Sequence, residues 1–225
     1  MKISTSIMAH PEREQSVTRL SFELNAGRSP LDWGTIPVAW DTEGAPSRDP
    51  ERIWNTARRA WELYDPSADW HLLLQDDAIV ATNLLEVLPR ALEYVPPACV
   101  VSLYVGTGRP LAGIWGRVCA EANEVGASWI VGPRPLWGVG LMLPTAVIPD
   151  MIAYCQTQRG VPDDMRLGRW AQRSKLETWF TWPCLVSHPE GSSLIGHGAG
   201  RTAWSFRGDA RGSAWDGPVV QWKRA

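Results

Sequence analysis

The sequence predicts a single α/β domain, built on a mostly parallel central sheet with helices on both faces. Three observations lead to this fold class. Short apolar runs alternate with longer amphipathic stretches through the first half of the chain, in a β-α-β rhythm. One of these runs, residues 70–79, has the continuous apolar pattern of a buried strand. With 225 residues, 44% of them hydrophobic, the chain is long enough to bury one sizeable core.

The first half of the chain supplies four expected strands and three expected helices. The strands cover residues 2–8, 36–40, 70–79 and 98–105, and the helices cover residues 12–25, 49–64 and 83–94. The first helix should end at Gly27, because glycine favours the position after a helix. Asp49 and Pro50 open the second helix as its N-cap and first helical residue. The internal Pro89 should kink or split the third helix.

The second half is less regular. Helices are expected over residues 111–125, 146–156 and 163–173, and strands over residues 127–131, 136–143 and 178–186. Glycines interrupt the 136–143 strand, which indicates either close approach of a ligand or a tightly packed sheet crossing. Residues 198–225 are rich in Gly, Arg and Trp and have no clear period, so an irregular tail is expected there.

Composition narrows the functional class. A net charge of -2 argues against a wholly basic nucleic-acid binder, although it is compatible with a local basic patch. No segment approaches the ~20 apolar residues of a membrane span, and the N-terminus lacks the apolar core of a signal peptide. The four cysteines show no C-x-x-C spacing, which indicates buried thiols in a reducing cytoplasm. Some of the 14 tryptophans must be core, and the rest are available for flat contacts with sugar or base rings.

The 70–79 strand ends at two adjacent carboxylates, Asp76 and Asp77. Open α/β sheets bind ligands at the carboxyl ends of their strands. Two acids at that edge can hold a divalent cation, and such a cation can neutralise a diphosphate leaving group. The alternative interpretation is an ordinary turn, or an aspartate that caps the following helix.

Six short motifs occur in an order that resembles one enzyme family. The first strand is followed by His10 and Arg13, the second strand ends at Asp41, and the third ends in the sequence QDD at residues 75–77. The sequences WGVG (137–140), PDD (162–164) and PCLVSH (183–188) follow. This order resembles the GT-A glycosyltransferases, and the small single-domain glycosyltransferases of bacteriophages look most similar.

The resemblance implies a Rossmann-type GT-A domain over residues 1–197. Residues 1–110 would be the nucleotide-sugar half, residues 111–197 the acceptor half, and residues 198–225 an Arg- and Trp-rich tail. It also implies that Asp77 and His188 bind Mn²⁺ or Mg²⁺, which accept oxygen ligands and, for Mn²⁺, an imidazole nitrogen. The side chains expected to contact a UDP-sugar donor are those of His10, Arg13, Asp41, Gln75 and Asp76.

Some of these positions have competing interpretations. Gln75 stands where many members of the family carry an acid, which removes one negative charge from the metal site but leaves a hydrogen-bonding group. His188 can equally be a loop histidine that contacts solvent or a carbonyl, and Arg13 can lie on a solvated helix face.

On the acceptor side, the resemblance implies that Asp164, or its neighbour Asp163, takes the proton of the attacking hydroxyl. Trp137, Gly138, Arg166 and Arg201 would contact the acceptor. The alternative for the acid pair is structural, because Pro-Asp-Asp is also a normal helix start that the helix dipole favours.

The function expected from the resemblance is metal-dependent transfer of a sugar from a UDP-sugar to an acceptor hydroxyl. One expected acceptor is a 5-hydroxymethylpyrimidine base in duplex DNA, in the host cytoplasm if the chain is phage-encoded. The tail favours this acceptor with five interleaved cations (Arg201, Arg207, Arg211, Lys223 and Arg224) and four aromatic rings (Trp204, Phe206, Trp215 and Trp222).

Three other functions remain open at this point. A cell-surface polysaccharide or another glycan fits as the acceptor of the same enzyme class. Another nucleotide-using α/β enzyme, such as a nucleotidyltransferase, would also need acids at strand ends, although the chain has no Gly-rich phosphate loop after its first strand. The tryptophan content favours a non-catalytic carbohydrate- or nucleic-acid-binding module.

Overall fold

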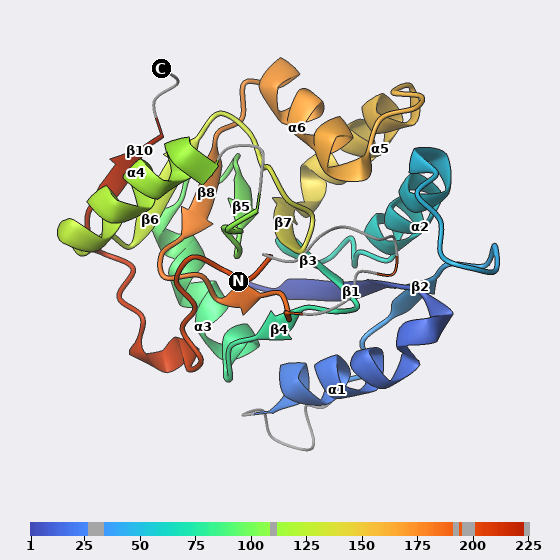
Figure 1. Ribbon diagram of the computed structural model, residues 1–225, viewed down its shortest axis with the longest axis horizontal. Helices are drawn as coiled ribbons and strands as arrows, with labels where there is room; N and C mark the ends of the chain where they lie inside the picture. Colours follow the sequence, from blue (N-terminus) through green and yellow to red (C-terminus); the bar gives the residue numbers. More distant parts are fainter. Residues whose placement is uncertain (27–33, 109–111, 191–193, 195–200, 223–225) are drawn as a thin grey trace.

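The computed structural model describes residues 1–26, 34–108, 112–190, 194 and 201–222 (Figure 1). Over these residues the chain folds as an α/β protein with six α-helices, one eight-stranded mixed sheet and a separate two-stranded sheet. Four of the seven neighbouring strand pairs in the large sheet are parallel, and three are antiparallel. The expected α/β class is therefore confirmed, with a sheet that is parallel by a narrow margin.

The strands are β1 (Ile3–Ala9), β2 (Val38–Trp40), β3 (Trp70–Gln75), β4 (Ile79–Val80), β5 (Val100–Ser102), β6 (Trp129–Gly132), β7 (Gly140–Pro144), β8 (Thr178–Thr181), β9 (Val186–Ser187) and β10 (Val219–Gln221). The α-helices are α1 (Glu14–Asn25), α2 (Pro50–Glu62), α3 (Leu84–Ala91), α4 (Ala112–Glu124), α5 (Ile148–Gln156) and α6 (Asp163–Arg173). Short 3₁₀ helices are η1 (Pro11–Arg13), η3 (Leu92–Tyr94), η4 (Thr145–Val147) and η5 (Ala210–Gly212).

The large sheet has the strand order β10-β6-β8-β5-β7-β3-β1-β2. Strands β1, β2 and β3 are parallel neighbours, and their carboxyl ends are level, because Ala9 lies opposite Trp40 and Met8 lies opposite Gln75. Strand β7 runs antiparallel to β3, so its amino end at Gly140 reaches the same edge. The residues that follow three strands and precede a fourth therefore meet at one edge of the sheet.

The helices cover both faces of the sheet (Figure 1). Helices α1 and α3 pack on one face, where Leu20 and Leu88 join one apolar core. Helices α2, α5 and α6 cover the other face with a second core that includes Trp54 and Trp170. Helix α4 covers β6, β8 and β10 through a third cluster around Trp115. Each helix thus packs its apolar face against the sheet, as the hydrophobic periodicity of its sequence predicts.

Two strands differ from the sequence prediction. The 70–79 stretch, by contrast, ends as a strand at Gln75, directly before the two carboxylates as expected, and Ile79 then begins β4, which pairs antiparallel with β9. The expected strand 136–143 begins only at Gly140, because the residues before it line a cavity. The expected strand 178–186 is divided into β8 and β9 around Pro183, which lacks the amide hydrogen that a continuous ladder needs.

The expectation of an irregular tail is partly wrong. Strand β10 pairs in parallel with β6 and completes one edge of the large sheet. Trp215 and Trp222 are 4% and 7% exposed and belong to the apolar cores. The expected domain boundaries at 110/111 and 197/198, the helix stop at Gly27, and Lys223 and Arg224 lie outside the described residues.

Two compositional expectations can be compared with the structure. All four cysteines are buried and free, as expected from their spacing. In the described part of the chain, no helix combines the length and apolar character that a membrane crossing requires.

His71 forms a buried polar network in the middle of β3. Its Nδ1 lies 2.8 Å from Ser4 Oγ and its Nε2 lies 2.9 Å from Ser6 Oγ, which in turn donates to the carbonyl of Ala60. The imidazole is inaccessible to solvent, and burial lowers the pKa of His71 to about 4. Two hydroxyls satisfy a neutral ring without supplying the negative charge that would favour an imidazolium.

We expect the ring of His71 to stay neutral while the pH falls from 6.5 towards 4. In the folded protein, the ¹³C and ¹⁵N NMR chemical shifts of the His71 imidazole ring should therefore remain constant across that range. The urea-unfolded protein is the control, because an exposed histidine titrates near 6.5. A midpoint near 6.5 in the folded protein would contradict the buried neutral network.

Candidate functional site

A cavity of about 730 Å³ lies at the sheet edge where β1, β2 and β3 end. It brings together nearly all the residues that the sequence singled out. These are His10, Arg13, Asp41, Gln75, Asp76, Asp77, Trp137, Gly138, Asp163, Asp164, His188 and Arg201.

The two acids after β3 have different partners. Asp76 Oδ2 accepts a hydrogen bond of 2.8 Å from the backbone N–H of His10, which ties the ends of β1 and β3 together. Arg13 Nη1 lies 3.1 Å from Asp77 Oδ2, and its Nε lies 3.8 Å from Asp76 Oδ1. Burial raises the pKa of Asp76 to about 6, and the charge of Asp77 acts in the same direction. Asp76 therefore links the ends of β1 and β3, while Asp77 forms the closer ion pair with Arg13.

The pairing of β4 with β9 brings His188 to Asp77. Ile79 lies opposite Ser187, so the residues just before β4 and just after β9 are neighbours. His188 Nε2 lies 3.0 Å from Asp77 Oδ2, and His188 Nδ1 lies 2.9 Å from the carbonyl oxygen of Pro189. Although burial favours the neutral forms, this contact holds the pKa of Asp77 below its ordinary value and that of His188 above it.

Asp77 and His188 bring one carboxylate and one imidazole together in the cavity, which are ligand types that Mn²⁺ accepts. Asp77 Oδ1 is buried and has no hydrogen-bond partner among the described residues. Metal-binding histidines usually donate their second ring N–H to a carbonyl or carboxylate, as His188 Nδ1 can to Pro189. Among the described residues, no three His, Cys, Asp or Glu side chains are placed so that they could hold a metal ion together. The two side chains fit Mn²⁺ or Mg²⁺ in the manner of sites that share the cation with substrate phosphates.

Gly138 is the point where the two halves of the cavity touch. A Cβ atom at this position would lie 3.2 Å from Gln75 Nε2, 3.4 Å from Asp163 Oδ2 and 4.0 Å from Asp164 Cβ. Glycine thus permits the end of β3 and the start of α6 to approach the same piece of backbone. The sequence signal for this contact was the glycine-interrupted run before β7.

Asp163 and Asp164 form the first turn of α6 and line the cavity opposite Asp77. Protein atoms surround both carboxyls, although the cavity keeps them partly accessible. Burial raises the pKa of Asp163, and burial together with the charge of Asp163 raises the pKa of Asp164 to about 7. Two adjacent acids in such surroundings cannot both ionise easily, so the fold favours the protonated forms.

Asp41 has a partner that the sequence analysis missed. Arg52 Nε lies 2.9 and 3.1 Å from the two carboxylate oxygens of Asp41, and Arg52 Nη2 donates to the carbonyl of Gly44. Burial would favour the neutral acid, but Arg52 keeps the pKa of Asp41 below its ordinary value. Arg52 lies on the buried stripe of α2 that continues with Thr56, and a cation on such a stripe was the available signal.

The expected acceptor contact of Arg166 does not fit its position. Arg166 is 0% exposed, and its Nη2 lies 2.6 Å from Glu51 Oε1. Its other donors bond to the carbonyls of Val161 and Cys155. Arg166 therefore ties α6 to α2 and lies outside the cavity lining, because a buried guanidinium needs a carboxylate and hydrogen-bond acceptors nearby.

Trp137 and two arginines complete the acceptor-side wall. The half-buried indole of Trp137 packs against Tyr104 at a ring-centroid distance of 5.7 Å. The hydroxyl of Tyr104 donates to the backbone carbonyl of Arg201. Arg134, which the sequence analysis did not select, lines the same wall.

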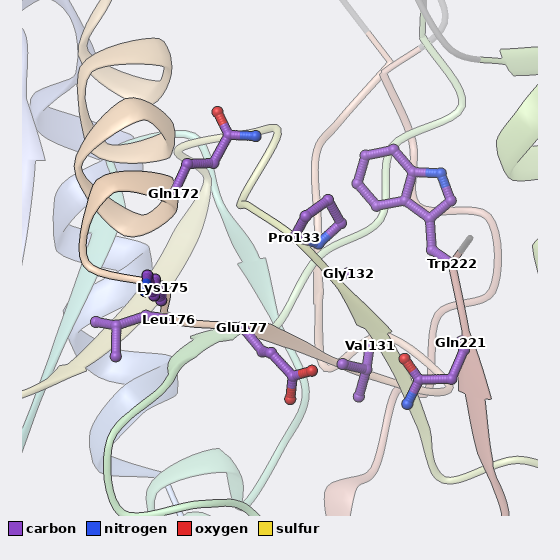
Figure 2. A pocket seen from close by; sticks show the side chains of 9 residues that line it. All are labelled: Val131, Gly132, Pro133, Gln172, Lys175, Leu176, Glu177, Gln221 and Trp222. Atoms are coloured by element: carbon purple, nitrogen blue, oxygen red, sulfur yellow. The ribbon is translucent and has the colours of Figure 1, made fainter. Parts of the chain in front are cut away.

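A second pocket of about 450 Å³ lies away from this site, between the end of α6 and the strands β6 and β10 (Figure 2). Lys175 and Glu177 are its charged lining residues, and Trp222 of the tail also lines it. The larger cavity, by contrast, is lined by acids and a histidine with shifted pKa values: Asp41, Asp76, Asp77, Asp163, Asp164 and His188.

Comparisons with known proteins add no family assignment. No protein-family model matches this chain, and no curated protein matches its sequence.

Replacing Asp164 with Asn should change how stability depends on pH. Folded Asp164 keeps its proton up to about pH 7, whereas an unfolded aspartate loses it near 3.8. Between these values the folded state binds more protons, so its stability falls as the pH rises. Because Asn does not ionise, Asp164→Asn should lose less stability than the wild type over this interval.

Urea unfolding at several pH values between 4 and 7 measures this difference. Asp216→Asn is the matched control, because Asp216 is exposed and should leave the wild-type pH dependence unchanged. Equal slopes for all three proteins would show that Asp164 is not held neutral by the fold.

Proposed function

We propose that this protein transfers a sugar from a UDP-sugar to an acceptor hydroxyl with the help of Mn²⁺ or Mg²⁺, and that it is related to the GT-A glycosyltransferases. One observation carries the proposal. The same cavity holds a metal-type pair, Asp77 with His188, and a base-type pair, Asp163 with Asp164. Glycosyl transfer needs both chemistries, because one centre must stabilise the leaving diphosphate and the other must accept the acceptor's proton.

On the donor side, Asp77 Oδ1 and His188 Nε2 would hold the cation. When bound there, the cation supplies positive charge that neutralises the leaving diphosphate. Arg13, 3.1 Å from Asp77, adds a fixed positive charge beside the same position. Asp41 lies at the end of β2 with its orientation fixed by Arg52, and its oxygens retain lone pairs for the N3–H of a uracil base.

On the acceptor side, the ionised member of the acid pair would accept a hydrogen bond from the attacking hydroxyl. As the hydroxyl oxygen bonds to the anomeric carbon and the bond to the diphosphate breaks, the proton passes to that carboxylate. A pKa of about 7 suits Asp164 to this task near neutral pH, because a base works best when its pKa is close to the operating pH.

Two acceptors fit this proposal, a hydroxymethylated base in DNA and a glycan. The tail argument for DNA is weaker than expected, since Trp215 and Trp222 are core residues and Arg211 pairs with Glu86 at 2.6 Å. Trp204 and Phe206 are each 38% exposed and stay available for contacts. Transfer of labelled sugar to hydroxymethylated duplex DNA, compared with transfer to polysaccharide, distinguishes the two acceptors.

Asp77→Ala should abolish sugar transfer and leave the fold intact. UDP with Mn²⁺ should raise the melting temperature of the wild type more than either compound alone, because the cation links the nucleotide to the protein. The variant should lose this combined effect and keep the wild-type circular dichroism spectrum.

Asp216→Ala, a change at an exposed aspartate, is the control and should behave as the wild type. Native turnover by Asp77→Ala would sink the metal assignment. The absence of any UDP or UDP–Mn²⁺ effect on the wild type would sink the proposed donor.

Asp164→Asn should lower turnover by about 10²–10⁴-fold, the usual contribution of a general base. Its affinity for UDP with Mn²⁺ should stay close to that of the wild type, because the acids lie on the acceptor side. Calorimetry and steady-state kinetics on the same samples separate the two effects. If donor affinity falls in step with turnover, Asp164 belongs to the donor site.

A further inference from the structure

We propose that Arg134 and Arg201 form an anion-binding subsite on the acceptor side of the cavity, so that the acceptor carries a phosphate or carboxylate near its reactive hydroxyl. This inference rests on the proposed function and adds the charge class of the acceptor.

Three other arginines with mostly buried side chains are paired with carboxylates. Arg13 pairs with Asp77, and Arg52 pairs with Asp41 at 2.9 Å. Arg166, outside the cavity, pairs with Glu51. By contrast, the guanidiniums of Arg134 and Arg201 form no ion pair or hydrogen bond with any residue that the structure describes, and Arg134 Nε is buried without an acceptor. A buried donor without a partner is costly, which is why such groups usually meet a ligand or water.

Packing directs Arg134 toward the acid pair. It lies in the loop between β6 and β7, where prolines flank it on both sides. This loop rests on Gly168 of α6, since a Cβ atom there would lie 3.3 Å from the carbonyl of Pro135 and 3.6 Å from Arg134 Cδ. Gly168 is one helical turn after Asp164, so the loop and the acids share one face of α6.

Arg201 lies between the two chemical centres. Its backbone is held by the hydroxyl of Tyr104, and its charge acts on both Asp164 and His188. The charge of Arg134 acts on Asp164. Both arginines therefore line the cavity within electrostatic reach of the acid pair, and the charge of Arg201 also reaches His188.

A simpler role for Arg134 and Arg201 would be to neutralise the acid pair, but that role does not explain why neither arginine pairs with it. Neither guanidinium forms an ion pair with Asp163 or Asp164, and burial still raises the pKa of Asp164 to about 7 despite both positive charges. The planar donors of arginine suit phosphate and carboxylate alike, because either anion can accept two parallel N–H bonds.

The test measures anion binding to the full-length protein saturated with UDP and Mg²⁺, so that the proposed diphosphate position is filled. Inorganic phosphate is followed by ³¹P NMR and ¹³C-labelled acetate by ¹³C NMR, which separates the two kinds of anion. We expect at least one of them to bind, and Arg134→Gln and Arg201→Gln each to weaken that binding about tenfold or more. Arg169→Gln is the control, because Arg169 is exposed and its hydrogen bond within the described residues goes to Gln158.

The outcomes separate this inference from the proposed function. If the wild-type protein did not bind UDP with Mg²⁺ at all, the proposed function itself would be overturned. Intact UDP–Mg²⁺ binding without phosphate or acetate binding, or with anion binding that the two arginine variants leave unchanged, would overturn only the subsite. Competition between phosphate and UDP would also overturn it, because the arginines would then bind the donor. Arg134→Lys and Arg201→Lys keep the charge, and partial binding in them would exclude a folding defect as the cause.

Discussion

The site depends on the level ends of three parallel strands. Met8 lies opposite Gln75 and Ala9 lies opposite Trp40, and the carboxylate of Asp76 bonds the backbone of His10 across the gap. A shift of one residue in either register would turn the side chains of the shifted strand to the other face. The Arg13 ion pair with Asp77 follows from this alignment. The pairing of β4 with β9 then adds His188, and α6 adds the two acids of its first turn.

Much of the fold could be predicted, because helical stripes and apolar runs are local signals. Helix α6 matches its predicted residues, and β1, β3 and α2 differ from prediction only at their ends. Strand β10 could not be predicted, since three residues with alternating exposure become a strand only beside β6. The Arg166 error has a similar cause: an arginine on a polar helix looks solvated until Glu51, 115 residues away, is placed beside it. Arg134 and Arg52 were missed because the sequence does not show which cations have partners.

Two buried networks act on stability in opposite directions. The neutral ring of His71 favours the folded state less as the pH falls from 6.5 towards 4, because only the unfolded chain takes up that proton. Over the same interval the protonated Asp163–Asp164 pair favours the folded state more. Between pH 6.5 and 4, the effect of the Asp163–Asp164 pair on folding stability thus opposes the effect of His71.

Glycine at residue 138 limits which substitutions the cavity lining can accept during evolution. One stretch of backbone is the common wall for Gln75 on one side and Asp163 on the other, with no atoms between to adjust. A Cβ atom there would crowd Gln75 Nε2 at 3.2 Å and touch Asp163 Oδ2 at 3.4 Å, so any larger residue acts on both walls at once. Under the proposed function, a substitution at residue 138 would alter the donor and acceptor sides together. A new acceptor preference is then expected to arise in the surrounding loops, while residue 138 stays a glycine.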